Sequence, residues 1–226
     1  MKLIYEGKTK DVYQLENGHV QLVFKDSCTG ENGVFNPGAN EVGLSIDGMG
    51  NYNLKVCKYF FDMLKSQGIT THYVDINTDK NTMEVLKCEP FGKGLEIIYR
   101  NFAYGSFILR YGLYAKPMDV LTDYVEVTLK DDERKDPLIT KEGLIALNIL
   151  NAEEYEQLVA LTIQISKLIT EDLAKKDIKL VDMKLEFGRT EQGQVILIDE
   201  IAAGNMRAFK DGKQLDPIEL SQLILK

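Results

Sequence analysis

The segment LVDMKLEFGR, at residues 180–189, places three charged side chains where they could act together. Asp182, Lys184 and Glu186 occupy every second position, with apolar residues between them. Because successive side chains of a β-strand point to opposite faces, one face would be apolar and the other would carry an acid, a base and an acid. Such a face is typical of a site that binds a cation and an anion together, or of a strand that simply faces water.

A further acid follows in VILIDEI, at residues 195–201. Its four consecutive apolar residues predict a buried strand, and the link TEQGQ predicts a hairpin back onto residues 180–187. We expect this hairpin to bring Asp199 close to Asp182, so that Asp182, Glu186 and Asp199 converge around Lys184. Mg²⁺ prefers hard oxygen ligands and takes one or two carboxylates together with water and phosphate oxygens. The predicted burial of the second strand favours a metal site here over a solvated face.

Lysines cluster in the N-terminal segment YEGKTKDVY, at residues 5–13. A glycine between two predicted strands gives a tight turn that a ligand can approach closely, and Lys8 and Lys10 would supply point charges for phosphate. Lys25 follows the next predicted strand and is a further candidate. The segment matches neither common Gly-rich phosphate motif, so a plain hairpin with exposed lysines remains the alternative.

Two later segments carry arginines beside turns. In IIYRNFAYGSFILRYG (97–112), Arg100, Ser106 and Arg110 lie where a strand passes into a short helix, which we expect Ser106 to cap. Free N–H groups, a hydroxyl and guanidinium groups would form an anion pocket. An interior ion pair and a simple cap are the alternatives. In EIAAGNMRAFKDGK (200–213), a Gly-rich turn before Arg207 could close over a substrate phosphate.

The histidines and cysteines are not expected to take part in catalysis or in metal binding. His19 and His72 have no partner at catalytic or metal-binding spacing, so each is predicted to be a surface or packed residue. The three cysteines are far apart, which fits a reducing compartment and buried thiols. They are Cys28, Cys57 and Cys88.

Composition narrows the class of protein. The 226 residues carry a formal charge of −8, which argues against a general nucleic-acid binder. No apolar run approaches the ~18–20 residues that span a membrane, and the N-terminus shows no signal-peptide pattern. We therefore expect a cytoplasmic protein, and the acidic balance still leaves room for a local basic pocket that binds a small phosphorylated ligand.

Hydrophobic patterns predict both strands and helices. Short strands fill residues 1–25, with a hairpin at Asn17-Gly18, and an irregular Gly- and Asn-rich segment spans 27–53. Further strands are expected at 71–76, 82–88 and 124–132, and helices at 54–68, 106–112, 152–175 and from Asp216 onward. A lysine-bearing hairpin followed by carboxylates on a later strand pair is the layout of an ATP site between two lobes, and the arginines imply a second, anionic substrate.

The motifs YEGKTKDVY, RNFAYGS, DPLI, LVDMKLEFGR and DEI, in this order, resemble those of the SAICAR synthetases of purine biosynthesis. The resemblance covers essentially the whole chain. It implies a Mg²⁺- and ATP-dependent ligase that condenses carboxyaminoimidazole ribonucleotide (CAIR) with L-aspartate through an acyl phosphate, giving SAICAR, ADP and phosphate. It also implies an α+β fold with two lobes. Residues 1–88 would form an antiparallel-sheet lobe similar to the ATP-binding lobes of kinases and ATP-grasp enzymes, and residues 89–226 a larger substrate- and metal-binding lobe.

The resemblance also implies a role for individual residues. Lys184 and Asp199 would be catalytic, and Glu186 and Asp199 would hold Mg²⁺. ATP would contact Lys8, Lys10, Lys25, Lys87, Glu89, Glu186 and Asp199, with the adenine near 87–89. The nucleotide substrate would contact Arg100, Ser106, Asp136, Asp182 and Arg207.

The chain departs from the family pattern in a loop and in NFAYGS, where it has Phe102 and Tyr104 in place of the usual smaller residues. After DEI the family commonly has Ser-Pro-Asp, where this chain has Ala202-Ala203-Gly204. The change affects the expected aspartate contacts more than the ATP site. A small-molecule kinase and a non-catalytic nucleotide-binding module are the competing functions, and a homodimer is a possible assembly. We also expect residues 27–53 to become ordered on ATP binding.

Overall fold

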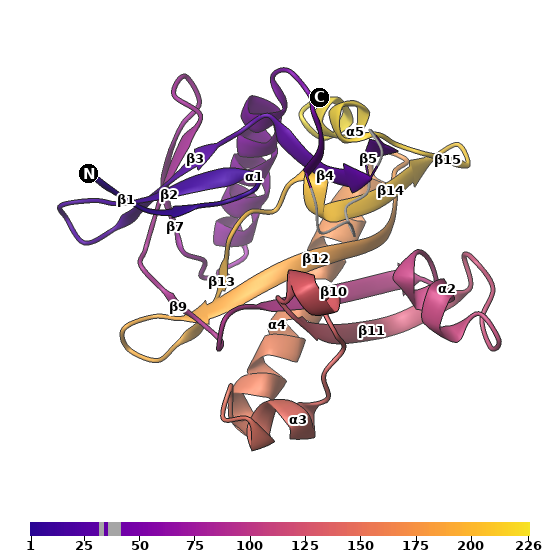
Figure 1. The fold of residues 1–226 in the computed structure, drawn as a ribbon. Coiled ribbons are helices and arrows are strands. Elements are labelled where there is room, and N and C mark those ends of the chain that lie inside the picture. The colour runs from indigo at the N-terminus through magenta and orange to yellow at the C-terminus, as the bar shows by residue number, and fades with distance from the viewer. Residues whose placement is uncertain (32–33, 36–41) are drawn as a thin grey trace.

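The computed structural model describes the chain except residues 32–33 and 36–41, and Figure 1 shows its arrangement. Two antiparallel sheets dominate. The first has the order β1-β2-β3-β8-β7, formed by Lys2–Glu6, Lys10–Gln14, Val20–Phe24, Thr82–Val85 and Tyr73–Asn77. Alternate residues of β3 are buried, because helix α1 (Met49–Ser66) packs against β3 and β7.

The second sheet has the order β11-β10-β12-β14-β15. Its strands are Val120–Leu129, Leu95–Phe102, Lys179–Arg189, Met206–Lys210 and Lys213–Gln214. The long strand β12 crosses the centre of the molecule, and its C-terminal part also pairs with β13 (Val195–Ile198) and β9 (Glu89–Pro90). Helix α4 (Ala152–Ala174) packs against β10, β11 and β12. Strand β12 thus pairs with four other strands and packs against α4.

Smaller elements complete the fold. Three short strands form a separate sheet, and the remaining helices lie in connections or near the C-terminus. These elements are β4 (Ser27–Glu31), β5 (Val34–Phe35), β6 (Val42–Ser45), α2 (Ser106–Tyr111), η1 (Asp132–Arg134), α3 (Lys141–Ala146), η2 (Ala203–Asn205) and α5 (Pro217–Ile224). In the described part of the chain, no helix is long and apolar enough to cross a membrane.

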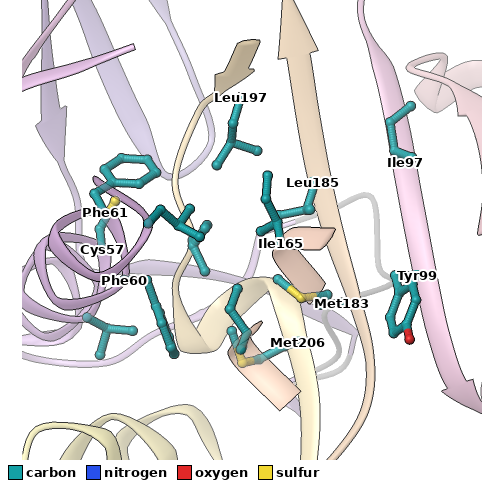
Figure 2. Close-up of a cluster of buried hydrophobic side chains, with 14 of the residues drawn as sticks. Cys57, Phe60, Phe61, Ile97, Tyr99, Ile165, Met183, Leu185, Leu197 and Met206 are labelled. Carbon is teal, nitrogen blue, oxygen red and sulfur yellow. The ribbon is translucent and has the colours of Figure 1, made fainter. Parts of the chain in front are cut away.

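The core explains the alternating pattern at 180–189. The apolar side chains of β12 between Asp182 and Glu186 are buried, and Figure 2 shows Met183 and Leu185 among side chains from α1, α4, β10 and β13. Phe60 and Phe61 of α1 contribute rings from the other side of this cluster. The buried residues form one core that extends from the first sheet to the second.

Most predicted helix ends are confirmed. Asn151 and Glu154 form the capping box of α4, and Asp216 caps α5 with Pro217 in its first turn. Gly18 has φ 86°, as the predicted hairpin turn requires. The α+β fold class is confirmed as well.

Two local predictions were wrong. Residues 27–53 are not irregular throughout, because they contain β4, β6 and the first turn of α1, although part of this segment lies outside the described residues. Asp26 explains the early helix start: its carboxylate accepts hydrogen bonds from the backbone N–H of Gly48 at 3.1 Å and of Gly50 at 2.8 Å. Ser106 makes no cap hydrogen bond to α2, and its hydroxyl is instead a partner of Arg100.

Candidate active site

Glu186 and Asp199 come together where β12 pairs with β13. The register sets Glu186 opposite Ile198, so Asp199 follows one position beyond the end of the pair. Asp199 has φ 62°, a left-handed conformation in which Asp is tolerated better than most residues. The side chains of Glu186 and Asp199 are only 14% and 23% exposed. Two acids therefore lie close together at the end of the β12–β13 strand pair.

The predicted third carboxylate lies elsewhere. Asp182 sits four positions before Glu186 on β12, where it is paired with Arg100 of β10 and Arg207 of β14. The prediction that Asp182 converges with Asp199 was wrong. The reason is that β13 covers only Glu186–Arg189, while β14 takes the earlier part of β12.

Three lysines lie among the acids. Lys10 contacts Asp199 at 2.9 Å and also pairs with Glu200. Lys130 contacts Glu186 at 2.7 Å, and Lys184 contacts Glu96 at 2.6 Å. This group of four carboxylates and three ammonium groups, called here the acid–lysine cluster, carries one net negative charge when every group is ionised.

The two acids Glu186 and Asp199 differ in how well nearby lysines stabilise their ionised forms. Burial and the nearby charge of Asp199 raise the pKa of Glu186 to about 7. Burial also disfavours the ionised form of Asp199, but Lys10 and Lys130 outweigh it and hold the pKa of Asp199 below its usual value. Burial alone would lower the pKa of Lys130, yet Glu186, Asp199 and Glu96 together raise it. Glu186 is thus the acid at which additional positive charge would be most favourable.

The donor set fits a nucleotide-borne metal ion. Among the described residues, no group of three or more His, Cys, Asp or Glu side chains could hold a metal by itself. Mg²⁺ in nucleotide sites commonly uses one or two protein carboxylates and takes its other oxygens from phosphate and water. Glu186 and Asp199 supply such a pair, beside lysines suited to phosphate.

A second charged group surrounds Arg100, which is only 1% exposed. Arg100 donates to Asp182 at 2.7 Å, to Glu126 at 2.8 Å and to the hydroxyl of Ser106 at 2.9 Å. Arg207 binds both oxygens of Asp182, at 2.8 Å each. The predicted residues Arg100, Ser106 and Arg207 are therefore in one place, and Asp182 links the two guanidinium groups.

Backbone geometry next to α2 makes room for Arg207. Gly105 has φ 52°, and a β-carbon at this position would collide with the Arg207 guanidinium. The same guanidinium lies 5.5 Å from the centre of the Tyr104 ring. The Tyr104-Gly105-Ser106 turn thus holds Arg207 on one side and Arg100 on the other.

The remaining predicted residues are spread around these groups. Lys8 contacts Asp132 of η1 at 2.6 Å, and Lys25 contacts Asp11 at 2.5 Å. Asp136 accepts a hydrogen bond from the backbone N–H of Asp131 at 2.7 Å and so fixes its own turn. Lys87 and Glu89 are exposed, Lys87 in the segment between the two sheets and Glu89 on β9.

Sequence reasoning missed Glu96, Glu126, Lys130 and Glu200. Both Glu96 and Glu126 are buried. Glu96 forms an ion pair with Lys184, and Glu126 forms ion pairs with Arg100 and Arg110. The available signal was a single acid within an otherwise apolar strand, since such an acid is rarely buried without a partner. Lys130 lies within the predicted strand 124–132 and directly after the observed strand β11, and it gave no pattern of its own.

Histidines and cysteines behave largely as predicted. His72 is buried with its Nε2 2.9 Å from the backbone oxygen of Asp199, and burial lowers its pKa to about 4. Cys28 and Cys57 are buried, and burial raises the pKa of Cys57 to about 12 and that of the partly exposed Cys88 to about 11. High pKa values keep these thiols protonated and unreactive.

Comparison with known proteins identifies the family. Residues 3–220 match the family model for SAICAR synthetase. The phosphoribosylaminoimidazole-succinocarboxamide synthase of Clostridium tetani is 53% identical over 100% of both chains. That of Finegoldia magna is 38% identical over 96% of this chain and 90% of its own.

Solved structures agree with the sequence matches. A SAICAR synthetase determined in complex with ADP superposes with a TM-score of 0.85 at 27% identity, covering 98% of this chain and 95% of its own. The Ehrlichia chaffeensis phosphoribosylaminoimidazole-succinocarboxamide synthase gives a TM-score of 0.84 at 28% identity, covering 98% and 91%. The chain belongs to the SAICAR synthetase family.

Proposed function

We propose that this chain joins the carboxylate of CAIR to the amine of L-aspartate, with ATP as the energy source and Mg²⁺ as the metal. Family membership makes it an ATP-dependent, amide-forming ligase of purine biosynthesis. The observation that carries the finer assignment is the layout of β12, which bears Lys184 and Glu186 in the acid–lysine cluster and Asp182 in the arginine group.

The spacing along β12 suits a ribonucleotide. Asp182 and Glu186 are four residues apart, which is ~13 Å along a strand. A substrate with a phosphate at one end and a carboxylate at the other can therefore reach both groups. Arg100, Ser106 and Arg207 would bind the phosphate, while Asp182 and Glu126 hold the guanidinium groups in place before the substrate arrives.

The reaction needs an activated carboxylate. A free carboxylate does not acylate an amine at neutral pH because its leaving group is poor. Transfer of a phosphoryl group from ATP gives an acyl phosphate, and the amine of aspartate then forms the amide and releases phosphate. Most of the protein's contribution to such a transfer is positioning and charge neutralisation.

The acid–lysine cluster would provide that neutralisation. Lys8 and Lys10 would contact the phosphates of ATP, and Lys184, held by Glu96, would orient the reacting carboxylate. Glu186 and Asp199 would hold Mg²⁺, which when bound neutralises phosphate charge. The position of Asp199 beside Lys10 supports this arrangement.

Other parts of the assignment are proposals of finer detail. We propose the lobes 1–88 and 89–226, an adenine site near Lys87 and Glu89, a contact of Asp136 with the substrate, and a role for Lys25 near the phosphates through the hairpin that it joins. A cytoplasmic location and a homodimer are also proposed. The backbone at Ala202-Ala203-Gly204 would contact aspartate in place of the missing Ser-Pro-Asp side chains.

Phosphate release tests the proposed function. The enzyme is supplied with Mg–ATP and CAIR, with and without L-aspartate, while the absorbance of the imidazole product is followed. Release that requires aspartate and equals product formation would support the ligase, and Asp199→Asn should then abolish both signals. Release that ignores aspartate would favour a small-molecule kinase, and nucleotide binding with no release would favour a non-catalytic module.

A further inference from the structure

Lys130 is a charged residue of the acid–lysine cluster that the motifs do not explain. It follows β11 directly, and its backbone N–H donates to the carbonyl oxygen of Gly94 at 3.2 Å. A β-carbon at position 94 would lie 2.8 Å from Cδ of Lys130, so the lysine stem packs closely over this glycine. The side chain is nevertheless 43% exposed. The stem of Lys130 is therefore packed at Gly94, while a large part of the side chain as a whole remains exposed.

The three lysines of the cluster differ in their partners. Lys184 is paired with Glu96, and Lys10 is paired with Glu200 as well as Asp199. Neither Glu96 nor Glu200 is a proposed metal ligand. Lys130 has its short contact with Glu186, one of the two proposed ligands.

We propose that Lys130 is a further catalytic residue, whose ammonium group leaves Glu186 and binds a phosphate of the nucleotide when Glu186 takes up its role as a metal ligand. The inference rests on the proposed function, because it needs Glu186 at the metal. In this role, the ammonium group of Lys130 would neutralise negative charge on the phosphate from the side of the site where β11 ends.

Electrostatics gives the reason for the exchange. A carboxylate that shares its electron pairs with a divalent cation attracts a neighbouring ammonium group less strongly, and the two cations repel each other. A lysine carries three rotatable donors on a flexible stem, so its head can move while the stem stays packed. The contact of Lys10 with Asp199 weakens in the same way, but Lys10 keeps Glu200 and Lys184 keeps Glu96. Lys130 is therefore the lysine whose short carboxylate contact is lost altogether.

Nucleotide binding separates this role from a structural one. The affinity for ADP is measured by calorimetry with and without Mg²⁺ for the wild type, Lys130→Met and Lys130→Arg. We expect Lys130→Met to weaken ADP binding about tenfold to a hundredfold when Mg²⁺ is present, as for a lost charge-assisted hydrogen bond. Without Mg²⁺, the affinity should change little, because Lys130 is then held by Glu186. Lys130→Arg should restore part of the affinity.

Matched variants make the result decisive. Lys167→Met removes another half-exposed lysine paired with one carboxylate, Asp123 at 2.8 Å, and should leave ADP binding unchanged. In turnover, Lys130→Met should lower kcat and leave KM for CAIR near its wild-type value. Thermal unfolding of each variant shows whether the fold is retained, and Lys130→Gln, which also removes the charge, replaces Lys130→Met in the test if Lys130→Met does not fold.

Two failures can be told apart. If Glu186→Gln abolishes the effect of Mg²⁺ but a folded Lys130→Met binds Mg–ADP as the wild type does, the inference about Lys130 is wrong and the proposed metal ligand stands. If Glu186→Gln leaves the effect of Mg²⁺ intact, the proposed ligand set is wrong, and the exchange at Lys130 falls with it.

Discussion

Arg207 and Asp182 form a bidentate ion pair, in which Nε and Nη2 of the arginine each donate to a separate carboxylate oxygen at 2.8 Å. Asp182 also accepts from Arg100 at 2.7 Å, so one acid fixes two guanidinium groups from different strands. The two arginines are thus oriented before any substrate binds. This pre-orientation reduces the ordering that binding would otherwise require.

Removal of Asp182 should cost stability as well as affinity. Breaking a buried pair by deleting one partner typically destabilises a protein by about 3–5 kcal/mol, because the remaining charge is left uncompensated. We expect a loss of this size for Asp182→Ala in urea unfolding. Glu156→Ala, which breaks the exposed pair with Lys141, should cost about 0–1 kcal/mol. Equal losses for the two variants would contradict the structural role of Asp182.

Gly105 should control binding of the ribonucleotide through Arg207. Gly105→Ala places a β-carbon against the guanidinium and also strains a backbone at φ 52°. We expect KM for CAIR to rise about tenfold or more, as for a misplaced charge-assisted contact. Gly193→Ala is the matched control, since Gly193 has φ 80° but open space around it. If KM for CAIR is as low in Gly105→Ala as in Gly193→Ala, the proposed role of Gly105 in placing Arg207 is wrong.

Glu96 should act as a positioning residue for Lys184. Glu96→Gln removes the charge 2.6 Å from the ammonium group but keeps the shape of the side chain. We expect kcat to fall while KM for ATP changes little, because Lys184 is proposed to orient the reacting carboxylate and not ATP. Glu96→Asp should restore part of kcat. A rise in KM for ATP with constant kcat would place Lys184 at the nucleotide instead.

The start of α4 should give a pH-dependent contribution to stability. The hydrogen bond from Arg189, 2.5 Å from Glu154, lowers the pKa of Glu154 below its ordinary value of 4.5. The ionised acid therefore stabilises the folded state above about pH 4.5, and this contribution disappears as the pH falls through the lowered pKa.

Glu154→Gln isolates this effect, because Gln can still serve in the capping box. The difference in unfolding free energy between wild type and variant should be full at pH 7 and should shrink below pH ~4.5. Glu153→Gln alters an exposed neighbour in the same helical turn and should show a much smaller difference. A difference that stays constant with pH would mean that the Arg189 pair does not depend on the charge of Glu154.

Local patterns predicted the elements well. The alternation at 180–187 is realised in β12, with Met183 and Leu185 in the core, and the caps of α4 and α5 are local hydrogen-bond motifs that short segments specify. Asp26 was missed as a cap because it lies more than twenty residues from the groups it binds.

Pairing between distant strands was harder to predict. A change of one residue in the register of a strand pair moves every side chain of that strand to the other face of the sheet. The choice of partner strand is equally hidden, because nothing near Asp182 in the sequence indicates that β14 and not β13 pairs with this part of β12. Lys130 was missed for a related reason. A charged residue directly after a strand resembles a surface position until its partner, here Glu186, is known from the fold.

The most direct measurement of the proposed function uses CAIR labelled with ¹⁸O in its carboxylate, together with Mg–ATP and L-aspartate. If the carboxylate is activated as an acyl phosphate, one labelled oxygen leaves with the phosphoryl group, so the released phosphate should carry ¹⁸O in proportion to the amide formed. Unlabelled phosphate, released while the amide accumulates, would contradict this activation step and the roles proposed for Lys184, Glu186 and Asp199.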